Sequence, residues 1–198
     1  PMDELSESLN VDLSEVPYSI VTYHPVTQDE DNVINDMAQL ISALESFPEM
    51  CFIITKANAD AGGREINAIW DQEQEKHKNW IVVTSLGAKR YLTALKHAQM
   101  MIGNSSSGIL EAPAAGIPTV NIGIRQKGRM MADSVICCDC RADTIADAIR
   151  YTGFDVFKDK LSTMSAPFGE GQTSGLIYGI CKEFLKDSKN LAKKFYDI

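Results

Sequence analysis

The sequence predicts an α/β protein with a doubly wound, parallel, Rossmann-like sheet. Short runs of aliphatic, β-branched and aromatic residues alternate along the chain with longer segments whose apolar residues recur at helical spacing. Each longer segment has enough residues for a helix that connects two parallel strands and covers the sheet. A chain of 198 residues is also long enough to bury a sizeable core.

Six short runs are predicted to be strands. The first, at 18–23, is aromatic and β-branched, which is typical of a buried strand. The others lie at 51–55, 80–84, 99–103, 118–123 and 133–138.

Helices are predicted between these strands. The segment 29–47 carries acidic residues in its first turn, where they interact favourably with the helix dipole. Further helices are expected at 63–76, 89–98, 106–115 and 142–152, and two helical stretches follow the loop at 169–175. In terms of domains, we expect an interdomain arm at 1–17, a Rossmann-like domain at 18–185 and a helical tail at 186–198.

Composition and charge argue against several functional classes. The net charge is −8 and no basic run occurs, which disfavours nucleic acids and anionic membranes as partners. No apolar stretch approaches the roughly 20 residues needed to span a bilayer, and the acidic N-terminal residues do not resemble a signal peptide. We therefore expect a cytoplasmic protein.

The common cofactor and metal motifs are missing from the sequence. Neither G-x-G-x-x-G after the first strand nor G-x4-G-K-[ST] occurs. The five cysteines, three of them in "CCDC", lack the second ligand pair of a zinc site and are expected to be small apolar residues at a strand end. We expect no metal and no cofactor.

Chemistry-bearing residues follow several of the predicted strands. His24 follows the first strand, "SLG" with Leu86 follows the third, "GNSSSG" (103–108) follows the fourth, and "GIRQKGR" (123–129) follows the fifth. Because parallel α/β sheets bind ligands at the carboxyl ends of their strands, these residues are the candidate site.

The segment 103–108, here called the serine corner, turns a strand into a helix. The unpaired N–H groups at the helix start and the hydroxyls of Ser105 and Ser106 would together bind a phosphate, and Gly108 would allow its close approach. The alternative is an ordinary helix cap, which needs one serine rather than three.

Two charged residues extend this hypothesis. Glu111, on the same helix, would repel a phosphate but would accept both hydroxyls of a ribose diol; the alternative is a carboxylate that stabilises the helix dipole. Arg125 offers a guanidinium for a diphosphate, unless the cations at 125, 127 and 129 are only a solvated charge run. His24 would donate to a phosphate oxygen or protonate a leaving group, or else be a capped loop histidine.

The motifs "HPVT", "GNSSSGILEAPAAGIPTVNIGIRQKGR" and "GEGQTSG" resemble those of the hydrolysing UDP-N-acetylglucosamine 2-epimerases. The resemblance covers nearly the whole chain but only the second half of the family, whose two Rossmann-like domains form a GT-B architecture. It implies that Ser105, Ser106 and Arg125 bind the phosphates, that Glu111 binds the ribose, and that Leu86 presents its backbone to the uracil. His24 would lie at the diphosphate or the departing oxygen, as the catalytic residue.

The resemblance also implies a reaction: UDP is eliminated to leave a glycal, which is hydrated with inversion at C2 to give N-acetylmannosamine for sialic-acid synthesis. The catalytic base would belong to the N-terminal domain that this chain lacks, so we expect the isolated chain to be inactive. A homo-oligomer is expected for the full-length enzyme. Alternatives are an epimerase for a UDP-2,4-diacetamido-trideoxy sugar, a GT-B glycosyltransferase, and a non-catalytic nucleotide-binding module.

Overall fold

The computed structural model describes residues 2–13, 16–26, 32–164, 167–169 and 171–186. Its internal contacts divide the chain into two units, Pro1–Pro167 and Phe168–Ile198. The first unit contains the sheet and all of the candidate site.

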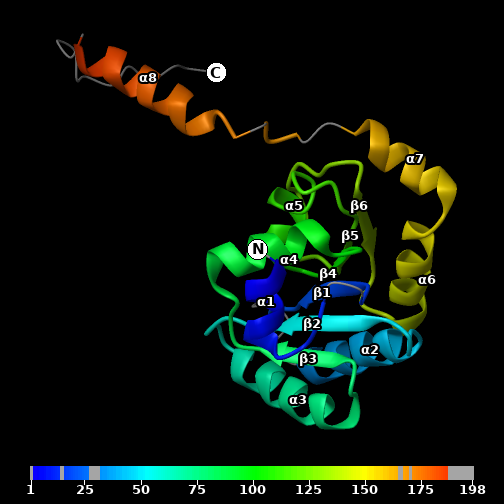
Figure 1. Cartoon of the computed structure of the whole chain (residues 1–198). Helices are drawn as coiled ribbons and strands as arrows, with labels where there is room; N and C mark the ends of the chain where they lie inside the picture. Colours follow the sequence, from blue (N-terminus) through cyan, green and yellow to red (C-terminus); the bar gives the residue numbers. More distant parts are fainter. Residues whose placement is uncertain (1, 14–15, 27–31, 165–166, 170, 187–198) are drawn as a thin grey trace. The chain divides into compact units, whose positions relative to one another are not determined.

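The six strands form one parallel sheet in the order β3-β2-β1-β4-β5-β6 (Figure 1). The strands are β1 (Tyr18–Thr22), β2 (Cys51–Thr55), β3 (Trp80–Val83), β4 (Met101–Gly103), β5 (Thr119–Ile122) and β6 (Val135–Cys138). This strand order is that of a Rossmann-like sheet, and it confirms the predicted fold class.

Helices cover both faces of the sheet, as in a doubly wound fold. In the first unit they are α1 (Met2–Leu9), α2 (Val33–Glu45), α3 (Gly63–Lys76), α4 (Gly87–His97), α5 (Ser107–Leu110), α6 (Ala142–Thr152) and α7 (Asp155–Thr163). Apolar residues of α2, α3 and α6 share one buried cluster with the sheet, and those of α1 and α4 share a second.

The two buried clusters explain why the strands are so apolar. All five residues of β1 and all five of β2 are buried, because both faces of the sheet are covered. In the first cluster Trp70 packs edge-on against Trp80, with 6.1 Å between the ring centroids. Each fully buried large apolar side chain contributes about 1.5–3 kcal/mol to stability.

The N-terminal segment is more than an extended connection. Residues 2–9 form α1, and Leu5 and Leu13 are 0% and 2% exposed within the second cluster. Lys89 of α4 also pairs with Glu4 at 2.6 Å. The segment therefore packs as part of the first unit, while its role between domains stays a prediction.

The helix expected at 106–115 is shorter than the sequence pattern indicated. Only Ser107–Leu110 is helical, and turns continue to Gly116. Pro113 lacks a backbone N–H, and Gly116 has a φ of 74°, so the α-helical hydrogen-bond ladder does not extend through this region. Residues 155–163, which had not been predicted to be helical, form α7.

The second unit contains α8 (Thr173–Lys186), the first of the two helical stretches expected near the C-terminus. Its apolar side chains are exposed within the described residues: Leu176, Ile177, Tyr178, Ile180, Phe184 and Leu185. The tail expected at 186–198 lies outside the described residues except for its first residue. Within the described parts of both units, no helix has the length and apolar character required to cross a bilayer.

Candidate functional site

The strand order brings three of the predicted loops to one edge of the sheet. β1 lies between β2 and β4, and Thr22 at its end is in register with Gly103 at the end of β4. β5 pairs with the other side of β4. The loops with His24, the serine corner and Arg125 therefore follow three adjacent strands, next to the point where the chain direction across the sheet reverses.

Gly103 allows the chain to turn closely past β1. Its φ is 131°, and a Cβ at this position would lie only 2.0 Å from the carbonyl oxygen of Thr22. The next residue, Asn104, donates its backbone N–H to that same oxygen at 3.1 Å. Only glycine fits here, so the first residue of the serine corner is fixed by backbone geometry.

Asn104 connects the three loops, and we had not singled it out from the sequence. Its side chain is fully buried; Oδ1 accepts from the backbone N–H of His24 at 2.7 Å, and Nδ2 donates to the His24 carbonyl at 2.8 Å. Its own carbonyl accepts from Gln126 Nε2 at 2.8 Å and from Arg125 Nη1 at 3.3 Å. An asparagine directly after a buried strand was the available signal.

The two serines lie half-buried at the turn. The hydroxyl of Ser105 accepts from the backbone N–H of Ser107 at 3.3 Å, whereas Ser106 makes no side-chain cap to α5 within the described residues. In that part of the chain no hydrogen bond engages the backbone N–H of Ser105 or Ser106. Because α5 is a single turn, these N–H and hydroxyl groups would contribute more to the predicted anion binding than a helix dipole would.

Gly108 has a different role from the one expected. It is buried, and a Cβ on it would lie 2.6 Å from Cγ2 of Thr119 on β5. The Thr119 hydroxyl donates to the Gly108 carbonyl at 2.8 Å. The glycine therefore allows α5 to pack on the sheet, and ligand approach does not explain it.

His24 is half-buried beside this corner. Its Nδ1 accepts from the backbone N–H of Asn58 at 3.3 Å. Burial lowers the pKa of the imidazole, and the nearby Arg125 lowers it further; Asp60 and the Asn58 side chain oppose this. The ring is therefore favoured in its neutral form.

A cavity of about 340 Å³ opens at the ends of β1, β2 and β3. Among the residues that line it are Thr22, His24, Thr55, Ser85, Leu86 and Tyr91. Two of the predicted site residues, His24 and Leu86, thus face one cavity although they follow different strands.

Tyr91, on α4, lines this cavity and is close enough to Glu111 for that charge to affect its hydroxyl. Its hydroxyl shares a 2.6 Å hydrogen bond with the buried Ser107 of the serine corner. Burial raises the pKa of Tyr91, the Ser107 hydrogen bond lowers it, and the charge of Glu111 raises it again. The exposed Glu111 carboxylate itself lines a separate cavity, together with Leu92 and Lys96 of α4.

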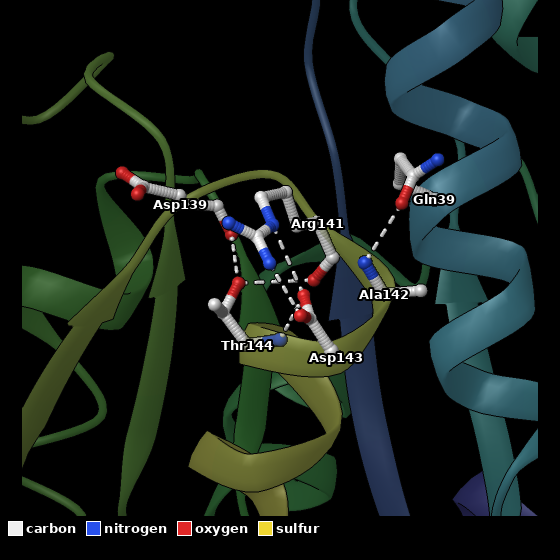
Figure 2. Close-up of polar contacts among 6 residues, drawn as sticks. All are labelled: Gln39, Asp139, Arg141, Ala142, Asp143 and Thr144. Carbon is white, nitrogen blue, oxygen red and sulfur yellow. Dashed lines mark hydrogen bonds and ion pairs between the residues drawn. The ribbon is translucent and has the colours of Figure 1, made fainter.

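The start of α6 lies at the same edge of the sheet but is capped internally, as Figure 2 shows. Gln39 Oε1 of α2 accepts from the Ala142 N–H at 2.9 Å, and Asp143 Oδ1 accepts from the Thr144 N–H at 2.8 Å. Arg141 forms an ion pair with Asp143. Side chains of the protein thus already use N–H groups at this helix start, in contrast with the serine corner.

The cysteines do not form a metal site. The three thiols of "CCDC" are free, and no group of three or more potential ligands that could hold a metal occurs among the described residues. Burial raises the pKa of Cys138 and of Cys140 to about 12. Cys137, on the edge strand β6, is exposed.

Comparison with protein families gives a match over residues 2–182 to the model described as UDP-N-acetylglucosamine 2-epimerase. The chain belongs to the UDP-N-acetylglucosamine 2-epimerase family. A protein named GDP/UDP-N,N'-diacetylbacillosamine 2-epimerase (hydrolyzing), from Campylobacter jejuni, is 38% identical over 67% of this chain and 35% of its own length. Polysialic acid biosynthesis protein P7 from Escherichia coli is 31% identical over 91% of this chain and 46% of its own length.

Solved epimerase structures share the fold. UDP-GlcNAc 2-epimerase from Neisseria meningitidis, bound to UDP-GlcNAc, has a TM-score of 0.74 at 13% identity and is matched over 91% of this chain and 48% of that one. This chain therefore spans less than half the length of each of these three proteins. The expected family and the expected Rossmann-like fold, which matches about half of the solved epimerase chain, are confirmed.

Proposed function

We propose that this chain is the UDP-binding half of a hydrolysing UDP-N-acetylglucosamine 2-epimerase, with the serine corner and Arg125 at the pyrophosphate. One observation carries the proposal: the Arg125 guanidinium lies 3.3 Å from the Asn104 carbonyl, immediately before Ser105 and Ser106. A cation and a set of N–H and hydroxyl donors are thus within reach of one anion. Arginine suits this role because its planar fork can bind phosphate oxygens in pairs.

The remaining predicted residues fit the other parts of the nucleotide. The cavity that Leu86 lines would hold the uracil, and Tyr91 adjoins both this cavity and Glu111. Glu111 would accept the ribose hydroxyls, since an exposed carboxylate forms strong hydrogen bonds with a diol. His24 lines the cavity next to the serine corner and would reach the pyrophosphate or the oxygen that departs with it.

These groups would assist the departure of UDP. When the bond from C1 of the sugar to the pyrophosphate oxygen breaks, the electron pair goes to UDP, and fixed donors stabilise the charge that develops. Removal of the C2 proton requires a base that this half does not supply in our proposal. The first domain of the full-length enzyme would provide it, so we expect the isolated chain to bind UDP weakly and to release no sugar. We expect the full-length enzyme to be a homo-oligomer.

The name of the Campylobacter relative favours a second substrate. That protein is named for N,N'-diacetylbacillosamine and is 38% identical over 134 residues, whereas a UDP-N-acetylglucosamine 2-epimerase from Neisseria meningitidis is 37% identical over 135 residues. A UDP-2,4-diacetamido-trideoxy sugar is therefore the alternative to UDP-N-acetylglucosamine, with the legionaminic-acid type of route as the alternative to the sialic-acid one. Both substrates carry the same UDP, so the roles proposed above hold for either.

Calorimetric titration of this chain with UDP tests the proposal. We expect Glu111→Ala and Arg125→Ala each to weaken binding by about 1–3 kcal/mol, the scale of a lost hydrogen bond to a charged group. Glu111→Ala should leave the affinity for 2′,3′-dideoxy-UDP unchanged, since that ligand has no ribose diol. Unchanged UDP affinity in both variants would contradict the proposed binding roles of Glu111 and Arg125. Release of N-acetylmannosamine by this chain alone would contradict the proposal that the catalytic base belongs to the first domain.

A further inference from the structure

The His24 ring is held by a hydrogen bond that determines which nitrogen carries the proton. The backbone N–H of Asn58 donates to Nδ1 at 3.3 Å. A ring nitrogen accepts a hydrogen bond only when it bears no hydrogen, so the hydrogen of the neutral ring is on Nε2. The backbone of His24 is fixed as well, through the two hydrogen bonds with Asn104.

The Asn58 N–H is in turn held in place by α3. Asn67 Oδ1 accepts from the backbone N–H of Ala57 at 2.7 Å, and its Nδ2 donates to the Ala57 carbonyl at 3.2 Å. A Cβ on Gly63, at the start of α3, would lie 2.1 Å from the Asn58 carbonyl. The loop after β2 therefore packs against α3. The Asn67 side chain of α3 binds both the N–H and the carbonyl of Ala57 in this loop.

The charged groups around the ring oppose its protonation on balance. Arg125 approaches from the loop after β5, and Lys56 lines the same cavity with its ammonium bound to Asp71 at 2.7 Å. Asp60 is the opposing carboxylate, and it accepts a hydrogen bond from the Asn58 side chain at 2.7 Å. Burial and Arg125 together lower the pKa of His24. Protonation would also direct an Nδ1–H at the Asn58 N–H and break that hydrogen bond.

We infer that Asn67, acting through Ala57 and Asn58, is a positioning residue that keeps His24 as the neutral Nε2–H tautomer, so that His24 donates a hydrogen bond to the pyrophosphate and does not release a proton. The identity of the acceptor rests on the proposed function, whereas the tautomer does not. No bond to hydrogen breaks at His24: UDP leaves as an anion, which is feasible because its terminal phosphate has a second pKa of about 6. A neutral imidazole then stabilises charge by donation alone, a role that neutral histidines have in other active sites.

Nitrogen-15 NMR of this chain, with labelled histidine and without nucleotide, tests the tautomer directly. We expect the His24 signals, identified by their absence in His24→Gln, to show a protonated Nε2 and an unprotonated Nδ1 at neutral pH. Asn67→Ala should mix the two tautomers. Asn79→Ala is the matched control, because this half-buried asparagine also binds backbone groups, the Pro48 and Met50 carbonyls, but at the opposite edge of the sheet. It should leave the His24 signals unchanged.

An imidazolium or an Nδ1–H tautomer in the unsubstituted chain at neutral pH would overturn the inference, even if Asn67→Ala does not fold. A folded Asn67→Ala variant with an unchanged tautomer would remove Asn67 as the positioning residue. Both outcomes are independent of whether the chain binds UDP. A wrong tautomer or a wrong role for Asn67 can therefore be distinguished from a wrong proposed function.

UDP titration of His24 variants tests the donor role. The side-chain amide of glutamine can place an N–H near the position of Nε2, so His24→Gln should retain UDP affinity within about threefold, whereas His24→Ala should lose about tenfold or more. Equal losses in the two variants would overturn the donor role, as would unchanged affinity in both.

Discussion

The guanidinium of Arg125 donates to the backbone carbonyl of Asn104, 21 residues earlier in the chain, at 3.3 Å. The same carbonyl accepts from Gln126 at 2.8 Å, and the Asn104 side chain binds both backbone groups of His24. One buried residue thus fixes the relative positions of the loops after β1, β4 and β5. A ligand that contacts two of these loops meets a preformed arrangement, which lowers the entropic cost of binding.

Asn104→Ala should therefore destabilise both the fold and the site. The change leaves the N–H and the carbonyl of His24 without their partners, and an unsatisfied buried group costs about 1–3 kcal/mol. We expect the free energy of unfolding, measured by urea denaturation, to fall by at least that amount, and UDP affinity to fall with it. Loss of stability with full UDP affinity would show that Asn104 supports the fold alone.

Gly108→Ala should destabilise the protein through a single contact. The new methyl group would lie 2.6 Å from Cγ2 of Thr119, and overpacking of this kind costs about 1–3 kcal/mol. Thr119→Ser removes that methyl group and keeps the hydroxyl that binds the Gly108 carbonyl at 2.8 Å. In urea denaturation the cost of Gly108→Ala should therefore be smaller in the Thr119→Ser background. An equal cost in both backgrounds would contradict the packing explanation.

His24 should make stability depend on pH in a defined direction. Burial and the nearby Arg125 lower its pKa from the ordinary value of 6.5, so the folded protein binds fewer protons at this site than the unfolded chain. The contribution of His24 to the free energy of unfolding is therefore fully present above pH 6.5. It is lost as the pH falls through the pKa of His24 in the folded protein. The free energy of unfolding of the unsubstituted chain should therefore fall more steeply below pH 6.5 than that of His24→Gln. Parallel curves would show that His24 does not contribute.

The sheet and the site edge were predictable because they depend on local patterns. The bounds of α3 and α6 agree with the sequence prediction, since both helices have clear apolar periodicity. His24, the serine corner and Arg125 were placed at one edge because parallel strands end together, and the strand order confirms their adjacency. Their roles in binding stay predictions.

Other features depend on contacts that no local pattern reports. The Asn104 side chain binds a residue 80 positions earlier, and the fit of Gly108 against Thr119 depends on how α5 meets β5. Leu92 and Leu95 are both apolar residues of α4, but Leu92 is 52% exposed whereas Leu95 is 1% exposed. The acidic, polar N-terminal segment gave little indication that Leu5 would be fully buried, because that depends on the packing of α1 near α4.

The ratio of UDP affinity to uridine affinity, measured by calorimetry, tests most directly whether the serine corner and Arg125 both bind the pyrophosphate. We expect UDP to bind more tightly than uridine, and Arg125→Ala and the double variant Ser105→Ala/Ser106→Ala each to reduce this ratio by about tenfold or more. Arg129→Ala removes the same charge from an exposed position in the same loop and should preserve the ratio. If both Arg125→Ala and the double variant weaken UDP and uridine equally, or leave both unchanged, the serine corner and Arg125 do not meet at the pyrophosphate.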